Sequence, residues 1–203
     1  MSRQQNKTSL NLDLLLNWLA VEVSSGRAHH SIVRALSRAK RAEALWIAPD
    51  FFELTIGAHA DATTMCVTRL FDRTRGTVSL YSLLTVARNH IGEFRNASAQ
   101  DVRTTLGESA TQLQGLEMKL TALRTRRHKT VAHKDPDPLV DPEGYIRDGK
   151  VSYQEIDVLF EQADDIIGKL CQLYFGKRPA INDPAAKQCD ALLTLLASVP
   201  KYR

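Results

Sequence analysis

The residues best suited to chemistry lie in one short basic segment, residues 124–134. This segment holds five cationic residues and two histidines with no acidic residue among them, namely Arg124, Arg126, Arg127, His128, Lys129, His133 and Lys134. Arginine binds phosphate through a planar, permanently charged fork, and histidine exchanges protons near neutral pH. An arginine and a histidine, without a metal, supply what cleavage of an RNA backbone needs. The arginine fixes the phosphate, and the histidine moves a proton on or off the 2′-hydroxyl or the leaving oxygen.

The phase of the helix that carries this segment singles out Arg127. Upstream, leucines recur at spacings of seven, three and four residues, as on one face of a helix: Leu106, Leu113, Leu116, Leu120 and Leu123. The next position of this stripe is Arg127. A charge at a position that calls for leucine must be paired, or must face an interface or a cleft.

Arg127 and His133 are six residues apart, so on a regular helix their side chains point about 120° apart, with about 9 Å of rise between them. They cannot touch each other, but two long side chains can bracket a phosphate. Unwinding of the last turn before Pro136, or a partner subunit, would bring them closer. Alternatively, the cations complement the macrodipole at a helix C-terminus, for a few tenths to about 1 kcal/mol. That alternative explains the charge cluster but not the arginine in the leucine stripe, and the spacing leaves both open.

The composition is that of an ordinary globular chain of 203 residues, with 43% hydrophobic residues and a net charge of +4 at pH 7. The positive charge permits an anionic partner without requiring one. Cys66, Cys171 and Cys189 are odd in number and belong to no pairing or zinc motif, which favours a reducing compartment. No apolar run approaches the roughly 20 residues needed to span a bilayer, and no secretory leader is found. We therefore expect a cytoplasmic protein that does not enter a membrane.

Other residues that bind metals or cofactors are scattered along the chain. His29 and His30 are adjacent and diverge on a helix, while His59 and His90 have no histidine partner one turn further on. There is no glycine-rich phosphate loop and no nucleophile elbow. We therefore predict neither a metal nor a cofactor, and we expect Asp72 to form a structural ion pair with an arginine.

The elements that position the basic segment are predicted to be helices throughout. No proline precedes Pro49 or lies between Pro49 and Pro136, and apolar residues recur at helical spacing. Helices are expected at about residues 10–41 with a kink or break at Ser24-Ser25-Gly26, 49–73 ended by Gly76, 80–94, 99–134, 153–175 after a Ser152–Glu155 capping box, and 184–198. Residues 135–151 are expected to form a loop with a hairpin-like turn at 145–150. The predicted fold class is an all-α helical bundle of about five to six helices.

The motif Arg127-His128-x-x-x-x-His133, late in a long helix of an all-α chain, resembles the R-x(4–6)-H signature of HEPN domains (higher eukaryotes and prokaryotes nucleotide-binding). In that signature a polar residue typically follows the arginine, and His128 fits. Three flanking phrases look like the abortive-infection, AbiU-type branch of HEPN proteins: Leu70-Phe71-Asp72, Ala132-His133-Lys134-Asp135, and Ser152-Tyr153-x-Glu155-Ile156-Asp157. The resemblance spans about residues 40–176.

The resemblance implies a homodimer in which the motifs of two subunits face each other across a groove, and a metal-independent endoribonuclease (R-x(5)-H) of a defence or toxin–antitoxin system. Arg127 would polarise the scissile phosphate, His133 would be the acid and base, and His128 would support them. The remaining cations would bind the RNA substrate: Arg124, Arg126, Lys129 and Lys134. An antitoxin protein is a further expected partner. Asp135 stands where one toxin subgroup has a tyrosine, so regulation through that tyrosine is not carried over.

The resemblance also sets the expected domain organisation, a single HEPN-like domain over residues 1–203. It comprises a core at about residues 40–176, an N-terminal helical region at 8–41 and a C-terminal helix at 184–198. Two alternatives stay open at this point. One is a non-catalytic module that binds RNA or nucleotides through the same cations, and the other is a helical interaction module.

Overall fold

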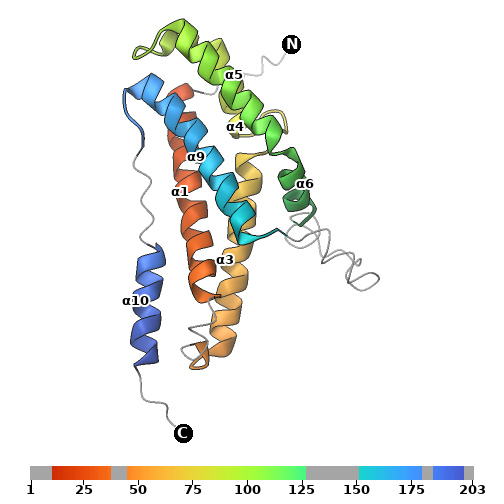
Figure 1. Cartoon of the computed structure of the whole chain (residues 1–203), viewed down its shortest axis with the longest axis vertical. Helices are drawn as coiled ribbons and strands as arrows, with labels where there is room; N and C mark the ends of the chain where they lie inside the picture. Colours follow the sequence, from red (N-terminus) through yellow and green to blue (C-terminus); the bar gives the residue numbers. More distant parts are fainter. Residues whose placement is uncertain (1–10, 38–44, 127–150, 180–184, 199–203) are drawn as a thin grey trace, which may run out of the picture.

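The computed structural model describes residues 11–37, 45–126, 151–179 and 185–198, and every regular element in these ranges is a helix (Figure 1). The elements are α1 (Leu12–Leu36), α3 (Pro49–Leu70), α4 (Leu80–Asn89), the 3₁₀ helix η2 (Ile91–Glu93), α5 (Ala99–Gly115), α6 (Glu117–Arg126), α9 (Tyr153–Phe175) and α10 (Ala185–Ala197). The prediction of an all-α bundle is confirmed. The predicted hairpin-like turn at 145–150 lies outside the described residues.

Three long helices, α1, α3 and α9, form the centre of the bundle (Figure 1). Helices α1 and α3 run antiparallel, since Glu22 pairs with Arg69 while His29, later in α1, contacts His59, earlier in α3. Helix α5 packs on α4 and α9 near one end, and α10 packs on α1 near the other. The main core is built from fully buried side chains of these helices, including Leu16, Leu19, Val67, Leu70, Leu83, Leu106, Leu159, Phe160, Ile166 and Ile167.

The first helix does not break at Ser24-Ser25-Gly26, because α1 is continuous from Leu12 to Leu36. Gly26 serves close packing instead. A Cβ atom added there would lie 2.5 Å from Cε1 of Phe160 on α9 and 2.9 Å from Cβ of Cys66 on α3. The glycine therefore lets three helices approach one another at the middle of the bundle.

The predicted ends of the next two helices also differ from the structure. Helix α3 ends at Leu70 rather than at residue 73, and Gly76 adopts φ +88° in the turn that follows. Helix α4 ends at Asn89, and a 3₁₀ turn takes the chain on to Phe94. Both ends tighten through i→i−3 bonds, a common way to satisfy the last carbonyls of a helix.

The helix predicted over residues 99–134 is divided at Leu116. The Leu116 amide bonds the Leu113 carbonyl at 3.3 Å, an i→i−3 bond, and Leu116 has φ −90° and ψ −3°. Gly115, a weak helix former, precedes the division. A new helix, α6, starts at Glu117 and is described up to Arg126. The predicted end of this helix at residue 134 lies outside the described residues.

In the second half of the chain, the helices agree more closely with those predicted from the sequence. The capping box of Ser152 and Glu155 opens α9, and Gly176 closes it in the left-handed region with φ +76°. Beyond it, α10 joins the far ends of α1 and α3 in a small second core of Leu36, Phe52 and Leu193. None of the helices within the described ranges is long and apolar enough to cross a membrane.

Candidate functional site

The centre of the predicted site falls outside the described residues. This applies to Arg127, His128, Lys129, His133 and Lys134, whereas Arg126 is the last residue of α6. The structure describes the helix that leads into this segment and the groups that hold that helix in place.

The leucine stripe that leads to Arg127 is buried along its whole length. Its members come from both sides of the division at Leu116, and each is at most 7% exposed: Leu106, Leu113, Leu116, Leu120 and Leu123. The Leu120 amide bonds the Leu116 carbonyl at 3.1 Å, so the α-helical register resumes directly after the division. The stripe thus keeps its phase up to Leu123, which is fully buried and stands four residues before Arg127.

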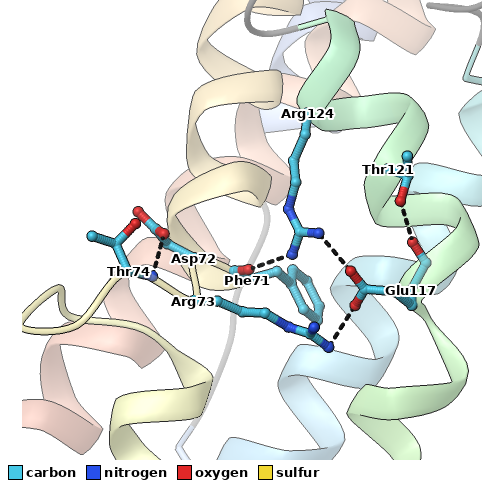
Figure 2. Close-up of polar contacts among 7 residues, drawn as sticks. All are labelled: Phe71, Asp72, Arg73, Thr74, Glu117, Thr121 and Arg124. Carbon is cyan, nitrogen blue, oxygen red and sulfur yellow. Dashed lines mark hydrogen bonds and ion pairs between the residues drawn. The ribbon is translucent and has the colours of Figure 1, made fainter.

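A carboxylate in the first turn of α6 joins two arginines. Oε2 of Glu117 forms an ion pair with Nη2 of Arg73 at 2.6 Å, and Oε1 accepts a hydrogen bond from Nη1 of Arg124 at 2.6 Å (Figure 2). Glu117 and Arg124 are seven residues apart, so they lie two turns apart on the same face of α6. Arg73 comes from the turn after α3. The carboxylate therefore ties α6 to itself and to the end of α3.

Arg124 makes a second contact with that same end of α3. Its Nη2 donates to the backbone carbonyl of Phe71 at 3.3 Å, and Phe71 is the buried C-cap residue of α3. Figure 2 shows Arg124 pointing from α6 towards this carbonyl and towards Glu117. Arg124 was predicted to bind RNA; the contacts described for it anchor α6, and a role with RNA stays a prediction.

The turn after α3 is itself held by local contacts. Oδ1 of Asp72 accepts from the backbone amide of Thr74 at 2.8 Å, and the guanidinium carbon of Arg73 lies 4.9 Å from the ring centre of Tyr81 on α4 (Figure 2 draws the first contact). The expected pairing of Asp72 with an arginine stays a prediction. The carboxylate stands next to Phe71 and Arg73, the two residues of this turn that α6 contacts.

The phrase that opens α9 is structural as well. Asp157 pairs with His30 at 3.0 Å and with Arg34 at 2.6 Å, both on α1, and the Tyr153 hydroxyl donates to Ser37 Oγ at 3.2 Å. These contacts fasten α9 to α1 just after the part of the chain that carries the motif. Backbone and side-chain hydrogen bonds from Ser152 lower the pKa of Glu155, so the carboxylate of the capping box stays charged.

A cavity of about 550 Å³ lies between α1, α3 and the start of α9. Its polar lining includes His30, Arg34, Thr63, Thr64 and Tyr153. Burial lowers the pKa of His30, and the adjacent Asp157 opposes that shift. Both threonine hydroxyls donate to backbone carbonyls one turn earlier in α3, so these hydroxyls already have hydrogen-bond acceptors within the helix.

Sequence reasoning missed Glu117 and Arg73. The spacing of seven between Glu117 and Arg124 was a usable signal, because it places opposite charges on one helix face. Arg73 gave no such signal, since it meets Glu117 only through the fold. Among the residues that the structure describes, no group of three or more histidine, cysteine or acidic side chains is placed to hold a metal ion.

The chain is similar to a known protein family. The family model described as HEPN_AbiU2, AbiU2, matches residues 11–192. The match contains α6, the motif segment after it, and α9. No curated protein and no solved structure matches the chain.

Proposed function

Because the chain belongs to the abortive-infection AbiU2 family of HEPN proteins, we propose that it is a metal-independent endoribonuclease of a defence or toxin-type system. The proposed active site is the motif Arg127-His128-x-x-x-x-His133. The observation that carries the proposal is the buried leucine stripe of α5 and α6, which keeps its phase up to Leu123, four residues before Arg127 in the sequence. A chain that buries every earlier position of the stripe and then places an arginine there needs an anionic or polar partner for that arginine.

The proposed reaction removes one proton from the RNA and returns one proton to it. His133, as a neutral imidazole, takes the proton of the ribose 2′-hydroxyl, and the resulting oxygen attacks the neighbouring phosphorus. The bond from phosphorus to the 5′-oxygen breaks, and that oxygen receives a proton from an imidazolium. The products are a 2′,3′-cyclic phosphate and a 5′-hydroxyl. Arg127 binds the non-bridging oxygens and stabilises the charge that builds up on the crowded phosphate.

Two copies of the chain suit this reaction better than one. On one regular helix Arg127 and His133 are about 9 Å apart along the axis and about 120° apart around it, so they can bracket a phosphate, but a single imidazole must then serve as both base and acid. In a homodimer, each copy supplies one imidazole, so one takes the proton while the other gives it. RNA and a second copy of the chain are the proposed partners, and an antitoxin protein is a further one.

The contacts around Glu117 have a role in this proposal. Arg124 and Arg73 converge on this carboxylate from α6 and from the end of α3, at 2.6 Å each. Because α6 leads directly into the motif in the sequence, the position of α6 fixes the point from which the motif segment starts. Catalytic groups need such rigid support, since small displacements of a reacting group are costly.

The experiment is an RNA cleavage assay in EDTA that compares the wild type with His133→Ala and Arg127→Ala. We expect the wild type to release products with 2′,3′-cyclic phosphate ends and both variants to lose cleavage. His90→Ala is the matched control, because His90 is a half-buried histidine at the C-cap of α4 that pairs with Glu93. Equal cleavage by the wild type and His133→Ala would remove the proposed active site.

Two other results identify the alternative functions. RNA binding that weakens steeply with salt, without any product, indicates a binding module in which the same cations grip phosphates. Absence of RNA binding, with a gain in stability for Arg127→Leu, indicates a helical interaction module. In that case the leucine would simply complete the stripe.

A further inference from the structure

Two histidines from different helices meet at the interface of α1 and α3. Nδ1 of His29 lies 2.7 Å from Nδ1 of His59, with the ring centres 4.9 Å apart and the rings tilted by 41°. Both side chains are half-buried. The two residues are thirty positions apart in the chain, so only the antiparallel packing of α1 and α3 brings them together.

The distance limits the protonation of this pair. Two nitrogens at 2.7 Å share one proton, because one must donate and the other must offer its lone pair. Burial, and then the neighbouring His29, lower the pKa of His59, which favours its neutral form. The charged side chains that follow Asp13 on α1 are paired with other residues: Arg27 with Asp164, Arg34 with Asp157, and Glu22 with Arg69.

We propose that His29 and His59 form a binding site for a divalent transition-metal ion that bridges α1 and α3. When the proton of each ring is on Nε2, both Nδ1 lone pairs are free to bind an ion between the rings, and neutral imidazole is a good ligand for zinc, nickel and copper. A tetrahedral ion with metal–nitrogen bonds of about 2.0–2.1 Å needs its two nitrogens about 3.3 Å apart. Side-chain rotations that widen the present contact by about 0.6 Å reach this geometry. The half-buried position leaves room for water at the remaining ligand positions.

Metal binding here replaces a shared proton by a stronger link between two helices. The proton between the rings moves, through solvent, to Nε2 of the ring that carried it, so both imidazoles stay neutral. Each Nδ1 then donates its lone pair to the ion, and acid competes with the ion for the same atoms. The other described histidines are less suited to such a site. His30 is buried against Asp157, and His90 pairs with Glu93 at the C-terminal end of α4. The site is separate from the proposed cleavage chemistry, which needs no metal.

The test is thermal unfolding of the full chain at pH 7.5 with Ni²⁺, Zn²⁺ or Mg²⁺, together with calorimetric titration by Ni²⁺. We expect Ni²⁺ and Zn²⁺ to raise Tm by about 5–10 °C at about one hundred times the Kd, and Mg²⁺ to leave it unchanged. One ion should bind per chain. Lowering the pH to 5.5 should weaken the binding.

The informative variants are His29→Asn and His59→Asn. Asparagine is a poor ligand for these ions but can still form a hydrogen bond across the interface, so the fold is preserved. Each variant should weaken Ni²⁺ binding by about tenfold or more, because one of two protein ligands is lost. His90→Asn and His133→Asn are the matched controls and should bind Ni²⁺ like the wild type.

The proposal is overturned if the wild type gains no stability from Ni²⁺ and Zn²⁺, or if His59→Asn responds as strongly as the wild type. Loss of the response in His133→Asn alone would place the ion at the motif and would also overturn it. The measurement uses no RNA, so its outcome is independent of the cleavage assay.

Discussion

Replacing Glu117 by alanine removes the one acceptor on which Arg73 and Arg124 converge at 2.6 Å each. Helix α6 then keeps its apolar contacts through the leucine stripe but loses the link from its first turn to the turn after α3. The contact between Arg124 and the Phe71 carbonyl, at 3.3 Å, is kept as a polar link between α6 and the end of α3. We expect a small loss of global stability and a larger loss of RNA cleavage.

The stability cost follows from the exposure of the three side chains. Arg73 is 50% exposed, and Glu117 and Arg124 are each 37% exposed, so water screens both ion pairs. Exposed pairs contribute about 0.2–1 kcal/mol each, and two of them give about 1 kcal/mol. For a chain of this size that loss lowers Tm by about 2–4 °C. The rate of RNA cleavage should fall by about tenfold or more, since a shift of about 1 Å in a reacting group costs up to about 10²-fold.

The assay compares Tm and the rate of RNA cleavage in EDTA for the wild type and Glu117→Ala. Glu108→Ala is the matched control, because Glu108 is an exposed glutamate on α5. Arg124→Lys adds a second test, since lysine keeps the charge but cannot bond Glu117 and the Phe71 carbonyl with a planar fork.

Two outcomes would refute the reasoning. Unchanged cleavage by a folded Glu117→Ala protein would mean that the contacts of Glu117 do not position the motif. A loss of Tm far beyond 2–4 °C would mean that these contacts belong to the core of the fold, and the argument from exposed ion pairs would fail. If the wild type itself does not cleave RNA, the proposed function fails first.

The remaining predictions concern packing and acid stability. Gly26→Ala should lower the free energy of unfolding in urea by about 1–3 kcal/mol, because the added Cβ would lie 2.5 Å from Phe160. Gly57→Ala is its control: nothing lies within 4 Å of its Cβ position in the middle of α3, so it should be neutral or stabilising by up to about 1 kcal/mol. Burial lowers the pKa of both His30 and His59 below the usual 6.5, so the folded chain binds fewer protons than the unfolded chain. Their contribution to stability is therefore complete above pH 6.5 and is lost as the pH falls towards the folded pKa values, which urea unfolding between pH 7.5 and 5.5 measures. His59→Asn should reduce that fall, and an equal fall in the variant would show that His59 does not titrate as argued.

The family and the helical class were accessible from the sequence because both depend on local patterns. The leucines that lead to Arg127 recur at helical spacing, and all are buried as the spacing predicts. Ser152 and Glu155 form the predicted capping box, since the hydrogen bonds of a cap involve residues only three apart. The resemblance to AbiU-type HEPN proteins, drawn from a motif and three short phrases, is confirmed by the family match.

Two of the differences between the sequence predictions and the structure concern Gly26 and Leu116. Gly26 was interpreted as a helix break because glycine lowers local helix propensity, but its value lies in the approach of Phe160 and Cys66 from other helices. The division at Leu116 was missed because the leucine stripe continues through it. A stripe records which face is buried and does not record whether the helix is interrupted.

What the sequence by itself determined is the helical class, the buried leucine face that leads towards the motif, and the motif and flanking phrases that indicate the family. Only the tertiary structure decided which faces meet. It joined Glu117 to Arg73 from the turn after α3, and it set His29 against His59 across two helices. The physical reason is that periodicity is a property of one helix, whereas a contact between helices depends on how all of them share one core.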